Sequence, residues 1–246
     1  MYFNINIISV NLENMQNLTC VSGYWKVKNK HEESFDKWFP STLKVNCPYV
    51  FFTDKETMPI IQKHRNGLPT YYIECNISDF ETYKFKHMML TDTIHCPSVE
   101  LNLIWNEKIF LIKKAAEINP FTSDFFCWID AGFCKFRKQL PPNTPFPDPE
   151  KLKYLPKDKF IYCSSLPYNE QLINVNNHYH HVSGTFILHK DIIHEFCKIY
   201  MNYLEKLLIH KNIWTDQVIL THIYKDNKHL FHKLCDGYGT IIKYLY

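Results

Sequence analysis

Glycine is scarce in this chain, with 6 glycines among 246 residues. So few glycines argue against a glycine-rich nucleotide-binding loop and against a fibrous repeat. The patterns Gly-x-x-x-x-Gly-Lys-Ser/Thr and Gly-x-Ser-x-Gly do not occur either, so the sequence offers neither a phosphate loop nor a serine elbow. His-Glu-x-x-His and the Cys/His spacings of structural zinc are also missing, which disfavours a zinc protease and a zinc finger.

The chain also lacks a strong charge bias and a long apolar run. Its formal net charge is +3, and Lys and Arg are scattered among acids, so the sequence shows no basic stripe for nucleic acid. No apolar run approaches a membrane-spanning length, and the first residues lack the pattern of a signal peptide. We therefore expect no nucleic-acid partner, no transmembrane segment and no signal peptide.

Cysteine is common, but no Cys-x-x-Cys pair occurs among the nine cysteines. Cys127, Cys163 and Cys197 lie inside apolar runs, where free thiols behave as small hydrophobic side chains. Unpaired thiols favour a reducing compartment. The prediction is a cytoplasmic protein.

The most informative stretch is Asp124-Phe125-Phe126-Cys127-Trp128-Ile129-Asp130-Ala131-Gly132. An apolar run without polar alternation is typical of a parallel strand that is covered on both faces. Asp130 then lies at the carboxyl end of that strand, where open α/β sheets bind their ligands. A carboxylate there needs a metal, a cation or hydrogen-bond donors; a plain turn-capping Asp is about equally compatible with the pattern.

Strands and helices alternate along the chain. We predict strands over 17–27, 48–54 and 70–74, helices over 31–43 and 55–65, and a long helix over 98–118 that Asn119-Pro120 ends. The first helix has early acids at Glu32 and Glu33. This alternation predicts a single α/β domain with a parallel sheet and right-handed crossovers.

The second half begins after a proline-rich segment, 139–156, which is either a loop over the site or, slightly better favoured, a connector. Strands are predicted over 160–163 and 181–188, and helices over 190–208 and 214–224. The tail from 229 to 246 is predicted to form one or two short strands.

Three acids are candidates for a ligand site. Asp54 and Asp130 both end buried strands and should lie along one edge of the sheet, Asp54 near a base or ribose. Asp216 begins a helix after the candidate N-cap Thr215. Taken alone, Asp54 is better interpreted as a turn cap and Asp216 as an acid that complements the helix dipole.

Metal ligands are harder to assign. His178, His180 and His181 precede a glycine-bearing strand, and such a cluster is more often a solvated loop than a metal or phosphate site. His229 or His232 could complete a metal site with Asp130, since a cation held by phosphates needs only one or two protein carboxylates.

Donors for a diphosphate are available near the same edge. Ser22-Gly23 resembles a tight turn that offers backbone N–H groups, and Lys108 and Arg137 offer cations. A solvated lysine is the plainer interpretation of Lys108. Aromatic side chains at Tyr24, Trp25 and Trp214 fit either a stacked base or sugar, or the core.

Taken together, these residues resemble the HtrL/YibB-type (WlaTC-like) glycosyltransferase family. The resemblance covers most of the chain in order and lies in Thr19-Cys20-Val21-Ser22-Gly23-Tyr24-Trp25, Cys47-Pro48-Tyr49-Val50-Phe51-Phe52-Thr53-Asp54, Trp105-Asn106-Glu107-Lys108, Asn119-Pro120-Phe121, Trp128-Ile129-Asp130-Ala131-Gly132 through Phe136-Arg137, and Trp214-Thr215-Asp216-Gln217.

The resemblance implies a GT-A-like fold, in which a mixed, mostly parallel sheet is flanked by helices. Such enzymes hold a divalent metal (Mn²⁺ or Mg²⁺) on the donor diphosphate with an Asp-x-Asp. Here a glycine, Gly132, stands in place of the second Asp of that motif. The resemblance then implies that Asp130 binds the metal together with His232, or that it contacts the donor sugar or ribose instead. Donor binding falls to Ser22, Gly23, Tyr24, Asp54, Trp105, Lys108, Asp130, Gly132 and Arg137. The strand with Ser183 and Gly184, together with Trp214, is expected on the acceptor side.

The predicted function is transfer of a sugar from a nucleotide-diphosphate donor, with a UDP-sugar favoured by the resemblance, to a hydroxyl of a glycan or of a protein- or lipid-linked acceptor. Asp216 is the candidate base and Asp130 its catalytic partner, with inversion and retention both open. A donor half is expected over about 15–137 and an acceptor half over about 158–246. The alternatives are a catalytically weak carbohydrate- or nucleotide-sugar-binding protein and a nucleotidyltransferase on a similar sheet.

Overall fold

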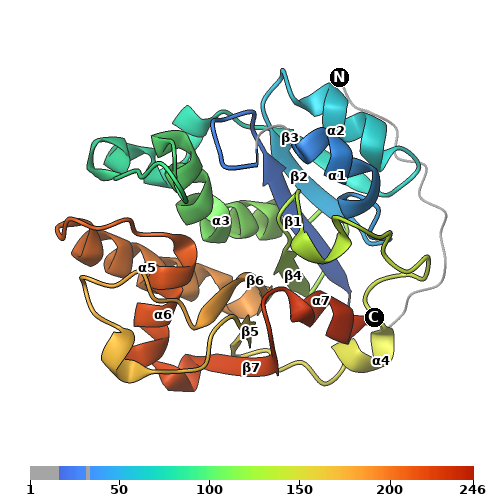
Figure 1. Ribbon diagram of the computed structural model, residues 1–246. Coiled ribbons are helices and arrows are strands. Elements are labelled where there is room, and N and C mark those ends of the chain that lie inside the picture. The colour runs from blue at the N-terminus through green and yellow to red at the C-terminus, as the bar shows by residue number, and fades with distance from the viewer. Residues whose placement is uncertain (1–16, 32–33) are drawn as a thin grey trace.

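A computed structural model describes residues 17–31 and 34–246. Its centre is a seven-stranded sheet in the order β3-β2-β1-β4-β6-β5-β7 (Figure 1). The strands are β1 (Leu18–Tyr24), β2 (Tyr49–Thr53), β3 (Thr70–Glu74), β4 (Phe125–Trp128), β5 (Phe160–Ser164), β6 (Val182–His189) and β7 (Phe231–Asp236). The early acids Glu32 and Glu33, expected at the start of the first helix, lie outside the described residues.

Most strand pairs are parallel. Strands β3, β2, β1 and β4 run together, β6 is antiparallel to both β4 and β5, and β7 is parallel to β5. The carboxyl ends of β1, β4, β5 and β7 therefore share one edge of the sheet. The predicted α/β domain with a mixed, mostly parallel sheet is confirmed.

Helices cover both faces of this sheet (Figure 1). One core lies under α3 (Val99–Ile118), α5 (Lys190–Leu208) and α6 (Asp216–Asp226). The other lies under α1 (Phe35–Thr42), α2 (Met58–Arg65), α4 (Pro149–Leu152) and α7 (Thr240–Leu245). Strands β2 and β4 are buried along their whole length, as their unbroken apolar sequences require.

Helix α3 is the longest helix in the described part of the chain, and it carries buried polar side chains. Ser98 caps its start by accepting the N–H of Leu101, and Asn119 ends it in the left-handed region at φ 40°. Leu101, Ile104 and Lys108 are spaced i, i+3 and i+7, so they lie on one helical face. That face closes the site described below.

Short 3₁₀ helices complete the described fold. They are η2 (Ile77–Asp79), η3 (Glu81–Met88), η4 (Cys134–Phe136), η5 (Glu170–Leu172) and η6 (Lys228–Leu230). Among the described residues, helices of the length and apolarity needed to cross a bilayer do not occur.

Two local predictions were wrong. The tail forms one strand, β7, and then the helix α7, whose Ile241, Ile242 and Leu245 pack into the core. Ser22-Gly23 is not a turn, because β1 continues to Tyr24 and both residues pair with β2.

The proline-rich segment 139–156 is a connector on the side of α7. Its backbone is tied to distant segments, since Phe146 N–H donates to the carbonyl of Asn46 and Asp148 N–H to that of Leu245. The ring of Phe146 packs against that of Tyr246, with ring centroids 4.9 Å apart. None of the described residues that line the two cavities below comes from this segment.

Candidate active site

A cavity of about 470 Å³ opens at the carboxyl ends of β1 and β4. We call it the main cavity. Its walls come from the end of β1, one face of α3, the residues after β4, the start of α6 and the loop between β7 and α7. From the predicted site, the residues that line it are Gly23, Tyr24, Trp105, Lys108, Asp130, Gly132, Arg137 and Asp216. Its position is that of ligand sites in open α/β sheets.

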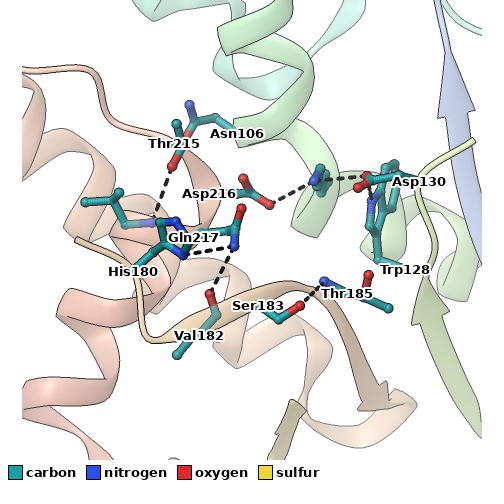
Figure 2. Close-up of polar contacts among 12 residues, drawn as sticks. Asn106, Trp128, Asp130, His180, Val182, Ser183, Thr185, Thr215, Asp216 and Gln217 are labelled. Atoms are coloured by element: carbon teal, nitrogen blue, oxygen red, sulfur yellow. Dashed lines mark hydrogen bonds and ion pairs between the residues drawn. The ribbon is translucent and has the colours of Figure 1, made fainter. Parts of the chain in front are cut away.

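The ammonium of Lys108 lies between two carboxylates at the floor of the main cavity. Its Nζ is 3.0 Å from Oδ1 of Asp130 and 2.9 Å from Oδ2 of Asp216. The Lys108 and Asp216 side chains are each 5% exposed, whereas that of Asp130 is 34% exposed. Figure 2 labels the two acids and draws these ion pairs as dashed lines. Asp130 is therefore the member of this trio that a ligand reaches most easily.

Burial and the ion pairs act in opposite directions on the pKa values of Lys108 and Asp216. Burial alone would lower the pKa of Lys108, but the carboxylates of Asp130 and Asp216 outweigh it and raise that pKa. Burial raises the pKa of Asp216, and the Lys108 ammonium opposes this effect. One ammonium between two carboxylates leaves the trio with a surplus of negative charge.

Asp130 is oriented by its own strand. The indole Nε1 of Trp128 donates to Oδ1 of Asp130 at 2.8 Å, so the residue two positions earlier fixes the carboxylate (Figure 2). The Lys108 Nζ also lies 5.8 Å from the centroid of the Trp128 ring. Trp128 and Lys108 therefore both contact Oδ1 of Asp130.

Gly184 on β6 makes room for the trio. Strand β6 is antiparallel to β4 and Cys127 pairs with Ile187, so Gly184 lies beyond this pair in the direction of Asp130. A Cβ atom at position 184 would lie 3.1 Å from Oδ2 of Asp216 and 3.3 Å from Nζ of Lys108. Because Gly184 has no Cβ atom, the ion pair of Lys108 and Asp216 can lie close to the backbone of β6.

Helix α3 also positions the start of α6. The amide Nδ2 of Asn106 donates to the carbonyl of Trp214 at 2.7 Å, and its Oδ1 accepts the hydroxyl of Tyr200 at 2.8 Å. Thr215 caps α6 through the N–H of Val218 (Figure 2). This network fixes the backbone directly before Asp216.

The rim of the main cavity is rich in cations and imidazoles. The guanidinium of Arg137 lies 3.8 Å from the centroid of the Trp38 ring, and its Nε donates to the carbonyl of Gly132 at 2.8 Å. Lys30 contributes another cation. The imidazoles at the rim are those of His31, His95, His178 and His180, and burial lowers the pKa of His31, His178 and His180.

Comparison with known sequences identifies the family. Residues 76–241 match the family model HtrL_YibB, described as a bacterial protein of unknown function, and this match covers more than half of the chain. The chain belongs to the HtrL/YibB family. The region matched by the HtrL/YibB model contains Lys108, Asp130, Asp216 and Asn106. A search of curated protein sequences found no match.

Solved structures show which fold this HtrL/YibB chain shares. Core-mannan synthase A (CmsA/Ktr4) of Aspergillus fumigatus, in its Mn/GDP form, aligns with a TM-score of 0.55 at 12% identity. The alignment covers 92% of this chain and 74% of that chain. The glycosyltransferase GlyE of Streptococcus pneumoniae TIGR4, in its apo form, aligns at 13% identity with a TM-score of 0.44, over 90% of this chain and 45% of that chain. The mixed α/β fold is thus shared with the core-mannan synthase.

Six of the predicted site residues are not among the described residues that line the main cavity. Two of them have structural roles of their own. Asp54 accepts the N–H and the hydroxyl of Thr57, both at 2.8 Å, so it is a turn cap before α2. Trp214 is 1% exposed, and its indole donates to the carbonyl of His210 at 3.1 Å. The other four are Ser22, Ser183, Gly184 and His232.

His232 cannot join Asp130 at a metal. The sheet register aligns Cys127, Ile187, Ile161 and His232 across β4, β6, β5 and β7. Three strand spacings separate the two ends of this row, which is about 14 Å at roughly 4.8 Å per strand. Within residues 17–31 and 34–246, no three His, Cys, Asp or Glu side chains gather in a group that would hold a metal ion. The prediction that Asp130 and His232 bind one metal ion together is therefore wrong.

Two aromatic residues of the site were not predicted from the sequence. Trp128 orients Asp130, and Tyr238 lines the main cavity between two glycines with positive φ, Gly237 and Gly239. Burial, followed by the carboxylate of Asp130, raises the pKa of Tyr238. The sequence Asp-Gly-Tyr-Gly near the end of the chain was the available signal, because glycines on both sides of one aromatic residue indicate a backbone shaped to present it.

Proposed function

We propose that this protein is a glycosyltransferase that moves a sugar from a nucleotide-diphosphate donor to a hydroxyl of an acceptor. The observation that carries the proposal is the buried Lys108 between Asp130 and Asp216, at the floor of a cavity on the carboxyl edge of the sheet. A carboxylate with a raised pKa, that of Asp216, and a buried cation that converge in one cavity are typical of reaction sites. The fold shared with a core-mannan synthase supports the same reaction class.

The charges of the main cavity suit a diphosphate. Lys30, Lys108 and Arg137 line it with two carboxylates, those of Asp130 and Asp216, so the fixed charges sum to +1. Arg137, stacked on Trp38 at the rim, is placed to bind phosphate oxygens. Tyr24 and Trp105 offer ring surfaces for a base. We keep the division into a donor half, 15–137, and an acceptor half, 158–246, as part of the proposal.

Of the two carboxylates that line this cavity, that of Asp130 is the better placed to bind a divalent metal. Asp130 is a third exposed and its bonds to Trp128 and Lys108 use Oδ1, whereas Asp216 is buried. A cation carried by phosphates needs no more than one or two such ligands. Asp130 would hold a metal on the donor diphosphate through Oδ2, and that metal would neutralise the leaving diphosphate.

The side chains of the chain itself supply the remaining chemistry. The bond between the sugar C1 and the diphosphate oxygen breaks, and a bond from C1 to the acceptor oxygen forms. The leaving diphosphate keeps the bonding electrons, and the Lys108 and Arg137 cations stabilise its charge. The acceptor hydroxyl loses its proton to the carboxylate of Asp216, whose pKa is raised by burial and therefore suits a base.

A thermal-shift panel tests this proposal. UDP-, GDP-, CMP- and dTDP-sugars are added with and without manganese, because a ligand that binds only the folded state raises the melting temperature by mass action. We expect stabilisation by the uridine nucleotide, a choice that rests on the family resemblance, followed by release of the nucleoside diphosphate on incubation. Asp130→Asn should lose the part of the thermal shift that depends on manganese. Asp158→Asn, at an exposed side chain, is the matched control.

The outcomes are separable. Stabilisation by a nucleotide other than the uridine nucleotide would change the proposed donor but would still support glycosyl transfer. Binding of a sugar nucleotide without any turnover, with glycan acceptors present, favours a nucleotide-sugar-binding protein. No shift with any sugar nucleotide contradicts the proposal.

A further inference from the structure

A second cavity, also of about 470 Å³, opens at the carboxyl ends of β5 and β7. Its walls come from the loop that follows β5, the end of β7 and Tyr224 of α6. Among the described residues, the two cavities share no lining residue. The proposed reaction uses none of the side chains in this second cavity, although its volume lies in the range of small-molecule sites.

The wall between the two cavities is thin. Ser165 lines the second cavity, and its hydroxyl pairs with Nδ1 of His180 at 2.8 Å, while His180 lines the main cavity. Gly237 lines the second cavity, and the next residue, Tyr238, lines the main one. A ligand that extends past this wall would therefore occupy both cavities.

Aromatic rings form one side of the second cavity. The ring centroids of Tyr168, His181 and Tyr224 lie 5.0 to 5.4 Å from one another. The imidazole of His181 is fixed at both nitrogens, by the Tyr162 hydroxyl at 2.9 Å and by the carbonyl of Leu166 at 2.7 Å. Rings held in this way offer a preorganised apolar surface with polar edges. The C–H face of a pyranose ring matches such a surface.

The polar groups of the second cavity are balanced in charge. Oδ1 of Asp236 accepts the hydroxyl of Ser164 at 2.5 Å and the ammonium of Lys233 at 3.0 Å. Both of these contacts use Oδ1, which leaves the lone pairs of Oδ2 for a ligand. One carboxylate with one ammonium gives no net attraction for a phosphate, in contrast to the main cavity, whose fixed charges sum to +1. A neutral polyol can donate to the carboxylate and accept from the ammonium.

We infer that the second cavity binds a neutral sugar ring, namely the part of a glycan acceptor that lies beyond the reacting hydroxyl. Binding of the sugar stands on the residues of the second cavity alone. Its role as the acceptor end rests on the proposed glycosyl transfer in the main cavity.

Saturation-transfer NMR with the full chain tests the inference. The probes are five neutral disaccharides: lactose, maltose, cellobiose, N,N′-diacetylchitobiose and mannobiose. We expect saturation of the ring protons of at least one of them, and a loss of at least about fivefold in Tyr168→Ala and in Asp236→Asn. The matched controls are Tyr154→Ala and Asp158→Asn. Tyr154 is 84% exposed, the Asp158 side chain is 71% exposed, and neither residue lines a cavity.

The same samples receive the sugar nucleotides of the thermal-shift panel, so the two ideas fail separately. Disaccharide signals that depend on Tyr168 and Asp236, without any nucleotide shift, support the sugar site and contradict the transferase. Nucleotide shifts with no disaccharide signal overturn the sugar site alone. Signals that stay unchanged in Tyr168→Ala and Asp236→Asn overturn it as well.

Discussion

At the scale of single residues, the site depends on one cation with two partners. Removing the ammonium of Lys108 leaves the carboxylates of Asp130 and Asp216 facing each other, with Asp216 buried. Breaking a buried ion pair by deleting one partner is strongly destabilising, because the remaining charge has no compensation. The interaction is therefore best tested by removing charges singly and together.

We predict that Lys108→Met lowers the free energy of unfolding by about 3 kcal/mol. The double variant Lys108→Met with Asp216→Asn should recover part of this loss, since the unpaired charge is removed. Urea denaturation of the wild type, both single variants and the double variant measures the coupling. Losses that simply add would mean that the two side chains do not interact.

Asp216→Asn isolates the chemical step. The amide keeps the size of the side chain but cannot take a proton, so turnover should fall by about 10²-fold or more. Binding of the sugar nucleotide should persist, because Asp130 and the rim cations remain. Product release and the thermal shift of the same sample measure the two effects, and unchanged turnover would remove Asp216 from the reaction.

Asp54 and Asp130 show how far local sequence predicts a site. Both follow buried strands, and the sequence placed both at the ligand edge. Asp54 is followed three positions later by Thr57, whose N–H and hydroxyl it accepts, so it caps a turn. Asp130 is followed by Ala131 and Gly132, and the indole of Trp128 and the distant Lys108 are its partners. A hydrogen-bond donor three residues later in the sequence therefore marks Asp54 as a turn cap. The contact between Asp130 and Lys108 depends on packing across the sheet, so the local sequence does not predict it.

At the scale of secondary structure, helix α3 joins the site to its surroundings through buried polar side chains. Next to Lys108, the carboxylate of Glu107 accepts the N–H groups of Glu81 and Thr82 and the hydroxyl of Thr82. Burial raises the pKa of Glu107 to about 7 from 4.5. The folded state therefore holds the proton of Glu107 more tightly than the unfolded chain does.

Glu107 should make stability fall as pH rises. Its contribution is complete below pH 4.5 and is lost as pH rises through about 7, because the unfolded chain releases the proton first. The difference corresponds to roughly 3 kcal/mol. Between pH 5 and 8, the melting temperature of the wild type should decrease with rising pH relative to that of Glu107→Gln. Glu117→Gln, on the exposed face of the same helix, serves as the control and should run parallel to the wild type.

The accuracy of the sequence predictions follows from the strength of local signals. Helix α3 has a serine cap at Ser98 and a stop at Asn119-Pro120, and it was predicted to within one residue. The tail was misread because Thr240, Ile241 and Ile242 favour strands in isolation. In the structure, Ile241, Ile242 and Leu245 share one helical face against the core, and Gly239 at φ 67° redirects the chain after β7. Tertiary packing decided the outcome there.

At the scale of the whole molecule, one sheet runs through both proposed halves. Strand β4 ends the first half and pairs with β6 of the second, and both cores draw residues from both halves. A fragment that ends before residue 158 would expose the edge of a fully buried strand. The two proposed halves therefore belong to one folding unit.

We predict that residues 17–157 expressed alone do not unfold cooperatively. The unpaired edge of β4 and the uncovered face of α3 should drive aggregation. Circular dichroism melts and size-exclusion chromatography of the fragment beside the full chain measure this. A soluble fragment with a sharp melting transition would show that the first half is an independent domain.

The close fit at Gly184 has a consequence for engineering. Every side chain larger than hydrogen would press on the buried carboxylate and ammonium behind β6. A saturation library at codon 184, screened for turnover, should return wild-type clones almost alone, even though this position lies behind the cavity wall. Attempts to broaden substrate range by mutagenesis would do better at rim residues such as His95, which is not part of the buried trio.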